Sequence, residues 1–225
     1  PDSEDGSFNL TGYEDCTLDY KLWQELEFRT DWFTVEVSND SGQNWFMIVW
    51  HNWITNTTEN EEVWTSWHWV LWNKSVPGWE DLVVAEGYDP DTGWINSHVM
   101  NLTDKMHFRF HLLANGSYQY KGVYLDDVYL NTSKNVTIPW NGVDKNWIWE
   151  ITPIFHDDME DPAYSDAHWI TYDGGPIGDK WHVTTTCYNS YNHSWWCGDE
   201  DPWSSYHKHL EIADLNSCLL YTSPS

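Results

Sequence analysis

The stretch Gly122-Val-Tyr-Leu-Asp-Asp-Val-Tyr-Leu130 decides the fold expected for this chain. Val, Tyr and Leu favour a pleated, half-buried strand, whereas Asp is depleted in strands because an unpaired carboxylate is costly to bury. The adjacent Asp126 and Asp127 therefore need a reason, and a bound cation or a β-bulge at the sheet rim supplies one. Neighbours on a regular strand point to opposite faces, so only a bulge would turn both carboxylates toward one site. The stretch predicts the closing strand of a β-sandwich.

The segments before this strand carry the period of two that half-buried strands show. Residues 15–23 alternate, with Cys16 and Leu18 on one face. Residues 33–38 and 45–50 flank a turn-forming cluster, which predicts a β-hairpin. The unbroken apolar run of its second arm predicts a strand buried on both faces. Together these patterns predict an all-β, antiparallel sandwich.

Composition indicates a folded and strongly acidic protein. The 225 residues include 19 Trp, 13 Tyr and 7 Phe, enough large apolar side chains for the core of one or two domains. There are 36 acidic and 10 basic side chains, a net charge of −26. This charge repels polyphosphate and anionic membrane surfaces, so we expect no nucleic acid partner. Since the sequence has no apolar run of about 18 residues, we also expect no membrane insertion.

Surface glycans and an oxidising compartment are expected from two features. Nine Asn residues begin an Asn-x-Ser/Thr triplet, where chance predicts about three. These acceptor residues are Asn9, Asn39, Asn56, Asn73, Asn101, Asn115, Asn131, Asn135 and Asn192. Four cysteines allow three disulfide connectivities, and we expect one disulfide between Cys187 and Cys197. We therefore expect an extracellular or cell-surface glycoprotein, and the chain as an internal piece of a longer exported protein.

Recognisable catalytic motifs are absent from the sequence. It contains no His-Glu-x-x-His, no Gly-x-Ser-x-Gly and no Gly-x-x-x-x-Gly-Lys. His207 and His209 share a strand face, as zinc ligands do, but no third ligand stands at a fixed spacing. A hydrolase domain is therefore the least favoured function class, and we expect this segment not to be an enzyme.

Two sets of residues resemble a known group of modules. Trp94, Val99-Met-Asn-Leu102, Phe108-Arg-Phe110 and the acidic strand resemble the second half of the MAM-like jelly-roll modules that accompany secreted peptidases of the immune inhibitor A type. Ser38-Asn-Asp-Ser-Gly42-Gln-Asn-Trp45 resembles their strand-turn-strand pattern. The resemblance covers roughly residues 8–130 and implies a concanavalin-like jelly roll that acts as a non-catalytic accessory module.

The resemblance also implies a structural calcium ion. Its ligands would be Asp126 and Asp127 together with two carboxylates of an opening strand, here Asp158 and Glu160. Hard carboxylate oxygens at strand and loop ends suit this cation. Solvent-exposed rim carboxylates in a very acidic protein are the alternative explanation.

The position of these carboxylates bears on the domain organisation. We expect residues 1–150 to form a jelly-roll module that lacks its first strands, with a linker or edge region over residues 131–151. Residues 151–225 would supply the opening strands of a second module or the strands that complete the first. In the second case the C-terminal segment closes a circularly permuted sandwich, and calcium ties the two segments together. Residues 217–225 resemble a translated sequencing-adapter tail.

The wealth of Trp allows two interpretations. Most Trp side chains must fill the core, but exposed rings on a sandwich stack on sugar faces. Trp67 and Trp69 share a strand face and are the candidate sugar-binding residues. We expect a non-catalytic accessory or adhesion module of a large secreted or cell-surface protein. Its partners would be other domains of that protein, glycans or surface proteins, and a carbohydrate-binding module is the alternative function.

Overall fold

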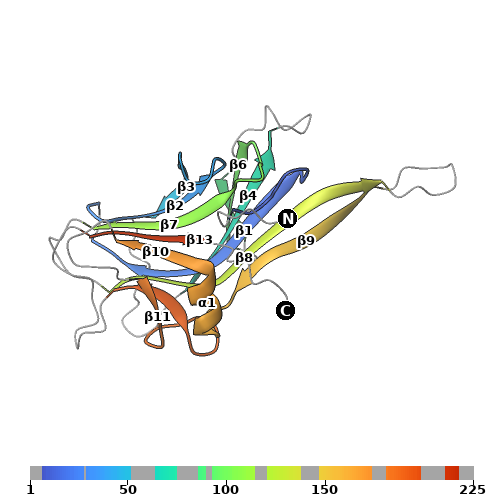
Figure 1. Cartoon of the computed structure of the whole chain (residues 1–225). Coiled ribbons are helices and arrows are strands. Elements are labelled where there is room, and N and C mark those ends of the chain that lie inside the picture. The colour runs from blue at the N-terminus through green and yellow to red at the C-terminus, as the bar shows by residue number, and fades with distance from the viewer. Residues whose placement is uncertain are drawn as a thin grey trace.

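The structure, a computed structural model, consists of two β-sheets and one short helix. It describes residues 7–27, 29–51, 64–74, 86–89, 93–114, 121–137, 147–173, 181–198 and 211–217. The two sheets face each other in Figure 1. The described residues therefore confirm the all-β sandwich.

The larger sheet has eight strands. Their spatial order is β11 (Trp181–Thr184), β12 (Ser194–Cys197), β8 (Gly122–Thr137), β1 (Asp15–Glu25), β4 (Thr65–Asn73), β6 (Gly93–Met100) and β5 (Glu86–Asp89), with β9 (Trp147–Asp157) also paired to β8. The pairing of β4 with β6 is parallel, and the other pairings are antiparallel. Strands β8 and β9 run side by side as a long ribbon that extends to one side (Figure 1).

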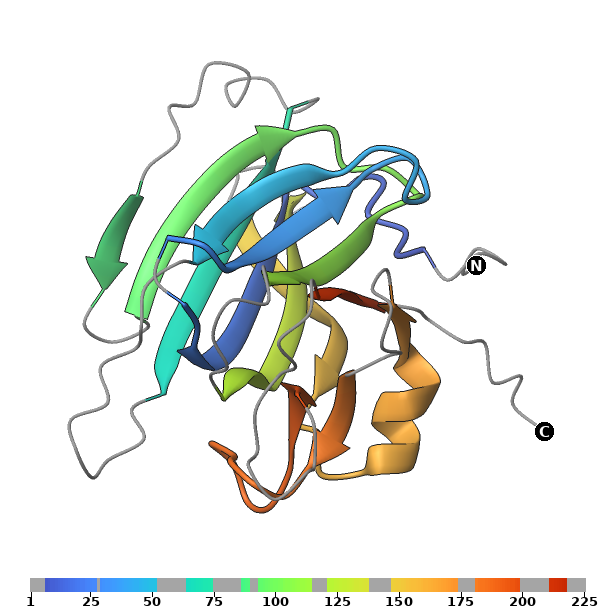
Figure 2. The same cartoon turned by 90° about the vertical axis from the view of Figure 1, so that its left-hand side faces the viewer.

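The smaller sheet has five antiparallel strands. Their spatial order is β10 (Trp169–Asp173), β13 (Glu211–Ser217), β7 (His107–Ala114), β2 (Trp32–Ser38) and β3 (Phe46–His51). Helix α1 (Pro162–His168) lies beside the C-terminal strands in Figure 2. The hairpin of β2 and β3 is confirmed. Burial of β3 on both faces is wrong: Met47 and Trp50, opposite Glu36 and Thr34, lie on the outward face of the smaller sheet and are exposed.

Strands that follow residue 150 are part of both sheets. In the larger sheet β12 pairs with β8, and in the smaller sheet β13 pairs with β7. Of the two alternatives for residues 131–151, the linker is wrong, because β8 continues to Thr137 and β9 begins at Trp147. The two strands form a continuous ladder in which Thr137 lies opposite Trp147. Thr and Val in this segment favour strand as much as its Asn residues favour turns.

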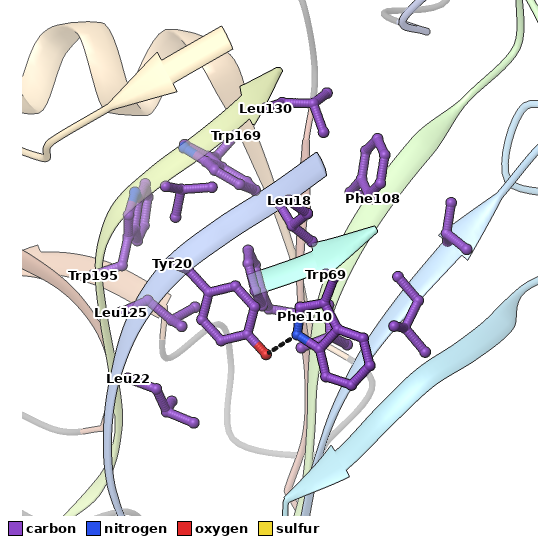
Figure 3. Close-up of a cluster of buried hydrophobic side chains, with 14 of the residues drawn as sticks. Leu18, Tyr20, Leu22, Trp69, Phe108, Phe110, Leu125, Leu130, Trp169 and Trp195 are labelled. Atoms are coloured by element: carbon purple, nitrogen blue, oxygen red, sulfur yellow. Dashed lines mark hydrogen bonds between the residues drawn. The ribbon is translucent and has the colours of Figure 1, made fainter. Parts of the chain in front are cut away.

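The main core lies between the two sheets and is built from alternate strand positions. Leu18, Tyr20 and Leu22 of β1 face Phe108 and Phe110 of β7, and none of the five is more than 2% exposed (Figure 3). These are the faces that the period of two predicted. The two sheets therefore close over one apolar layer, and functional groups have to lie on the outer faces or at the rims.

The acidic strand contains the β-bulge that two adjacent carboxylates require. Asp19 of β1 lies opposite Tyr129 and Lys21 opposite Asp126, so two residues of β8 face one residue of β1. At the bulge Asp127 has a φ of 50°, a left-handed conformation that Asp tolerates better than most residues. Along its other edge β8 pairs with β12 before the bulge and with β9 after it. Both carboxylates therefore lie where the edge of β8 is open.

Candidate functional site

Asp126 is a buried acceptor that organises a loop. Its side chain is 0% exposed. The backbone N–H groups of Asn189 and Ser190 donate to Oδ2 at 2.8 Å each, and the hydroxyl of Ser190 and the N–H of Asp127 donate to Oδ1 at 2.9 and 2.7 Å. A carboxylate has about four acceptor positions, and protein donors occupy all of them. Burial raises the pKa of Asp126 to about 6, although the hydrogen bonds from Ser190 and Asn189 oppose that change.

A second carboxylate binds the same loop, which we define as residues 185–193. Glu160 accepts hydrogen bonds from the N–H groups of Asn192 and His193 at 2.9 and 3.1 Å, and its other oxygen lies 3.3 Å from Nδ1 of His193. Burial raises and these hydrogen bonds lower the pKa of Glu160, with a net decrease. The 185–193 loop is thus held in its middle by Asp126 and near its C-terminal end by Glu160.

The other two predicted calcium ligands lie nearby. Asp127 accepts from Nδ2 of Asn189 at 3.0 Å, and Asp158 accepts from the N–H of Glu160 at 3.2 Å. Val128 lies opposite Asp157 on the ladder of β8 and β9, so Asp127 and Asp158 flank the same pair of residues. Burial and the charges of Asp127 and Asp158 raise the pKa of Tyr129. The structure thus brings the acidic strand and the later segment together. Within the described ranges, however, no three His, Cys, Asp or Glu side chains form a metal-binding group. The calcium ion stays a prediction.

Asp157 is a third loop anchor, and sequence reasoning missed it. Its carboxylate is 2% exposed and accepts from the N–H of Met159 at 2.9 Å, the hydroxyl of Ser165 at 2.8 Å and Nε1 of Trp169 at 2.7 Å. It therefore fixes the turn after β9 and helix α1. The signal in the sequence was an Asp between the buried Phe155 and Met159, at the inward position of the alternation.

Beside the 185–193 loop lies a set of buried aromatic rings on the outer face of the larger sheet. This outer aromatic cluster consists of Trp23, Tyr124 and Trp196 with Cys187 of the loop. The rings of Tyr124 and Trp196 stack with centroids 5.3 Å apart, and Nε1 of Trp196 donates to the carbonyl of Lys121 at 2.7 Å. All four side chains are at most 4% exposed.

The cluster bears on the expected Cys187–Cys197 disulfide, which stays a prediction. Both side chains are buried in the structure. Cys187 packs in the outer aromatic cluster with Trp196, whereas Cys197 packs in the main core between the sheets. Since neighbours on a strand point to opposite faces, Trp196 and Cys197 look away from each other, and the two thiols lie on opposite sides of β12. Cys218 lies outside the described residues.

The structure corrects the prediction of Trp67 and Trp69 as sugar-binding residues. They do share a face, with rings stacked 6.2 Å apart, but that face points inward: Trp69 is 2% exposed and Trp67 packs against the core. Nε1 of Trp69 donates to the hydroxyl of Tyr20 at 3.2 Å, and that hydroxyl lies 3.1 Å from Nε2 of His51 (Figure 3 shows the first bond). Burial lowers the pKa of His51 to about 3, so the ring is neutral.

The exposed Trp side chains lie instead on the outer face of the smaller sheet. Trp32 and Trp50 are 38% and 46% exposed, and their ring centroids are 4.8 Å apart. Thr34 lies opposite both Trp50 and His111, so polar groups continue the row. In the next row Nε of Arg109 donates to Glu36 at 2.9 Å. We call this surface the Trp32/Trp50 face. Alternation within residues 45–50 could have suggested it, but the apolar run pointed to burial.

The predicted glycan acceptors lie in different surroundings. Asn9, Asn101 and Asn192 are exposed, and Asn39 and Asn131 are half-buried. Asn73 is wrong as an acceptor: it is 4% exposed and its Nδ2 donates to the carbonyl of Tyr13 at 2.8 Å, leaving no room for a glycan. Asn56, Asn115 and the side chain of Asn135 lie outside the described part of the chain.

Comparisons of the chain with protein-family models, curated proteins and solved structures gave no match. In the part of the chain that the structure describes, no helix has the length and apolar character needed to cross a bilayer. The candidate binding surfaces are the outer faces of the two sheets.

Proposed function

We propose that this chain is a non-catalytic accessory or adhesion module of a large secreted or cell-surface protein, and that it binds glycans through the Trp32/Trp50 face. The observation that carries the proposal is the pair of exposed, mutually packed Trp rings on an outer sheet face. Such rings offer a flat apolar platform for the C–H face of a sugar.

The polar groups beside the rings suit sugar hydroxyls. Glu36 provides carboxylate acceptors, while Arg109, which also lies 4.2 Å over the ring of Trp45, provides fixed guanidinium donors. The half-buried His111, which lies opposite Thr34, adds a ring that can donate or accept. Small-molecule sites typically combine an apolar surface with a few polar groups at fixed positions.

The net charge narrows the class of glycan. At −26 the protein repels uronic acid and sulfated polymers, and the repulsion reaches about 8–10 Å at physiological salt. We therefore propose uncharged polysaccharides as ligands of the Trp32/Trp50 face.

Affinity electrophoresis in gels that contain uncharged polysaccharides tests the proposal. The wild-type protein should be retarded by at least one of them, and the double variant Trp32→Ala/Trp50→Ala should lose at least about tenfold in affinity, since each stacked ring contributes on the order of 1 kcal/mol. Tyr191→Ala is the matched control, because Tyr191 is 81% exposed on the 185–193 loop.

Two results would contradict the proposal. Retardation that survives in the double Trp variant would remove the Trp32/Trp50 face as the site. Equal losses in the double variant and in Tyr191→Ala would indicate non-specific adhesion of aromatic rings.

We also propose that the module is a jelly roll completed by its C-terminal segment, as a circularly permuted sandwich. Support comes from the pairing of β9 and β12 with β8 and of β13 with β7. A chain cut after residue 150 would lose the partners of two strands and should show no cooperative unfolding transition. Cooperative unfolding of residues 1–150 alone would show that the later segment belongs to another module.

A further inference from the structure

A groove on the outer face of the larger sheet is separate from the Trp32/Trp50 face. It has a volume of about 390 Å³ and is lined by Asp15, Thr17, Asp19, His68, Asn131 and Ser133 on three neighbouring strands, with Ile151 of β9 at one side. That volume is within the range of small-ligand sites, roughly 300–1,000 Å³. Polar groups of these strands lie beside apolar side-chain surface such as that of Ile151, and this combination suits the hydroxyls and the C–H face of a sugar.

The strand register explains the groove. Asp15, Thr17 and Asp19 alternate on the outward face of β1. Across the sheet Asp15 lies between Trp72 and Ser133, and Asp19 lies between His68 and Tyr129. The two carboxylates are therefore about 13 Å apart along the strand, with the small Thr17 between them forming the floor.

The two carboxylates of the groove differ in their surroundings. Asp19 lies 2.5 Å from Nδ1 of His68. Asp15 is only 7% exposed although it lines the groove, and its Oδ2 accepts from the hydroxyl of Ser133 at 2.6 Å. Burial raises the pKa of Asp15, and the hydrogen bond from Ser133 opposes this. A ligand that brings a positive charge or N–H donors to Asp15 would stabilise its ionised form.

We propose that this groove binds an oligosaccharide of amino sugars, with a protonated amine at Asp15 and sugar hydroxyls on Thr17, Asn131 and Ser133. The carboxylates favour ammonium over acetamido groups, and Trp72 next to Asp15 adds an aromatic ring near the expected cation. The overall charge of −26 favours the same ligand through long-range attraction. This site is independent of the proposed Trp32/Trp50 face.

Isothermal titration calorimetry on the unglycosylated protein tests this proposal, since Asn131 would otherwise be a glycan acceptor inside the groove. The probes are a β-linked glucosamine tetrasaccharide, its fully N-acetylated form, and spermine, which has amines but no hydroxyls. We expect the glucosamine tetrasaccharide to bind at least tenfold more tightly than either other probe. Asp15→Asn should weaken that binding at least tenfold, whereas Asp104→Asn, which removes an exposed carboxylate elsewhere, should change it less than twofold.

Three outcomes would overturn the proposal. Equal binding of the acetylated and the deacetylated tetrasaccharide would remove the role of the amine. Spermine as tight as the tetrasaccharide, or equal losses in the Asp15 and Asp104 variants, would reduce the effect to general attraction of polycations. Trp32→Ala/Trp50→Ala should leave glucosamine binding unchanged, so failure at either face is distinguishable from failure at the other.

Discussion

Both sheets carry aromatic rings on their outer faces, but the rings on the larger sheet are buried and those on the smaller sheet are exposed. On the larger sheet Trp23, Tyr124 and Trp196 are at most 1% exposed and pack with Cys187 of the 185–193 loop. On the smaller sheet Trp32 and Trp50 pack with each other and remain 38% and 46% exposed. Both sets sit on strands of similar composition.

This difference shows that an aromatic ring on an outer face is buried only where another segment of the chain packs over it. The 185–193 loop is that cover, and its position depends on buried acceptors, chiefly Asp126. The Trp32/Trp50 face has polar neighbours such as Glu36 and Arg109 instead. The outer aromatic cluster therefore contributes to stability, and the exposed Trp32/Trp50 face is the surface that we propose for binding.

The largest expected effect comes from removing a ring of the outer aromatic cluster. Trp196→Ala should lower the free energy of unfolding by about 3–5 kcal/mol, because it leaves a cavity beside Tyr124 and removes the hydrogen bond to Lys121. Urea unfolding measures this. Trp32→Ala is the matched variant on the other sheet and should cost under about 1 kcal/mol. A similar loss of unfolding free energy in Trp196→Ala and Trp32→Ala would contradict the distinction between the two outer faces.

Removal of the loop anchor should have the next largest effect. Asp126→Ala leaves the N–H groups of Asn189 and Ser190 without their acceptor and should cost about 2 kcal/mol. Cleavage within the 185–193 loop should become faster in limited proteolysis. Asp127→Ala removes one bond at a half-exposed position and serves as the control. A loop equally resistant in both variants would show that Asp126 is not its anchor.

The pH dependence of the free energy of unfolding tests the role of Asp126. Its pKa is about 6 in the folded protein and near 3.8 for an ordinary Asp, so the folded state binds more protons between these values. The free energy of unfolding therefore falls as pH rises through this window, and Asp126→Asn should make that fall smaller. Burial also raises the pKa values of Asp15 and Asp157. Their contribution to the fall of the free energy of unfolding should remain in the Asp126→Asn variant. An unchanged pH profile in the variant would contradict the assignment.

Calcium should have the smallest effect. Protein donors occupy all four acceptor positions of Asp126, so an ion could use only the half-exposed Asp127, Asp158 and Glu160. We expect a small rise in Tm with calcium relative to chelator, measured by circular dichroism. Identical midpoints would rule out a structural ion and leave the carboxylates as loop anchors.

The sequence by itself determined many of the strands and their inward faces, and it gave a β-bulge as one of two explanations for the acidic pair. A period of two placed Leu18, Tyr20 and Phe110 in the core, and adjacent carboxylates at Asp126 required a local irregularity. These are local properties, because alternation and the desolvation of a charge depend on neighbouring residues. The expectation that residues after 150 meet the acidic strand also came from the sequence.

Only the tertiary structure decided which faces are covered. Trp69 and Trp50 occupy similar strand patterns, yet Trp69 is buried because its side of β4 faces the core, whereas Trp50 is exposed because its side of β3 faces outward. Likewise Cys187 and Cys197 are ten positions apart in sequence but lie on opposite faces of a sheet. Such outcomes depend on which distant segments pair and which loop covers an outer face, and strand periodicity carries no information about either.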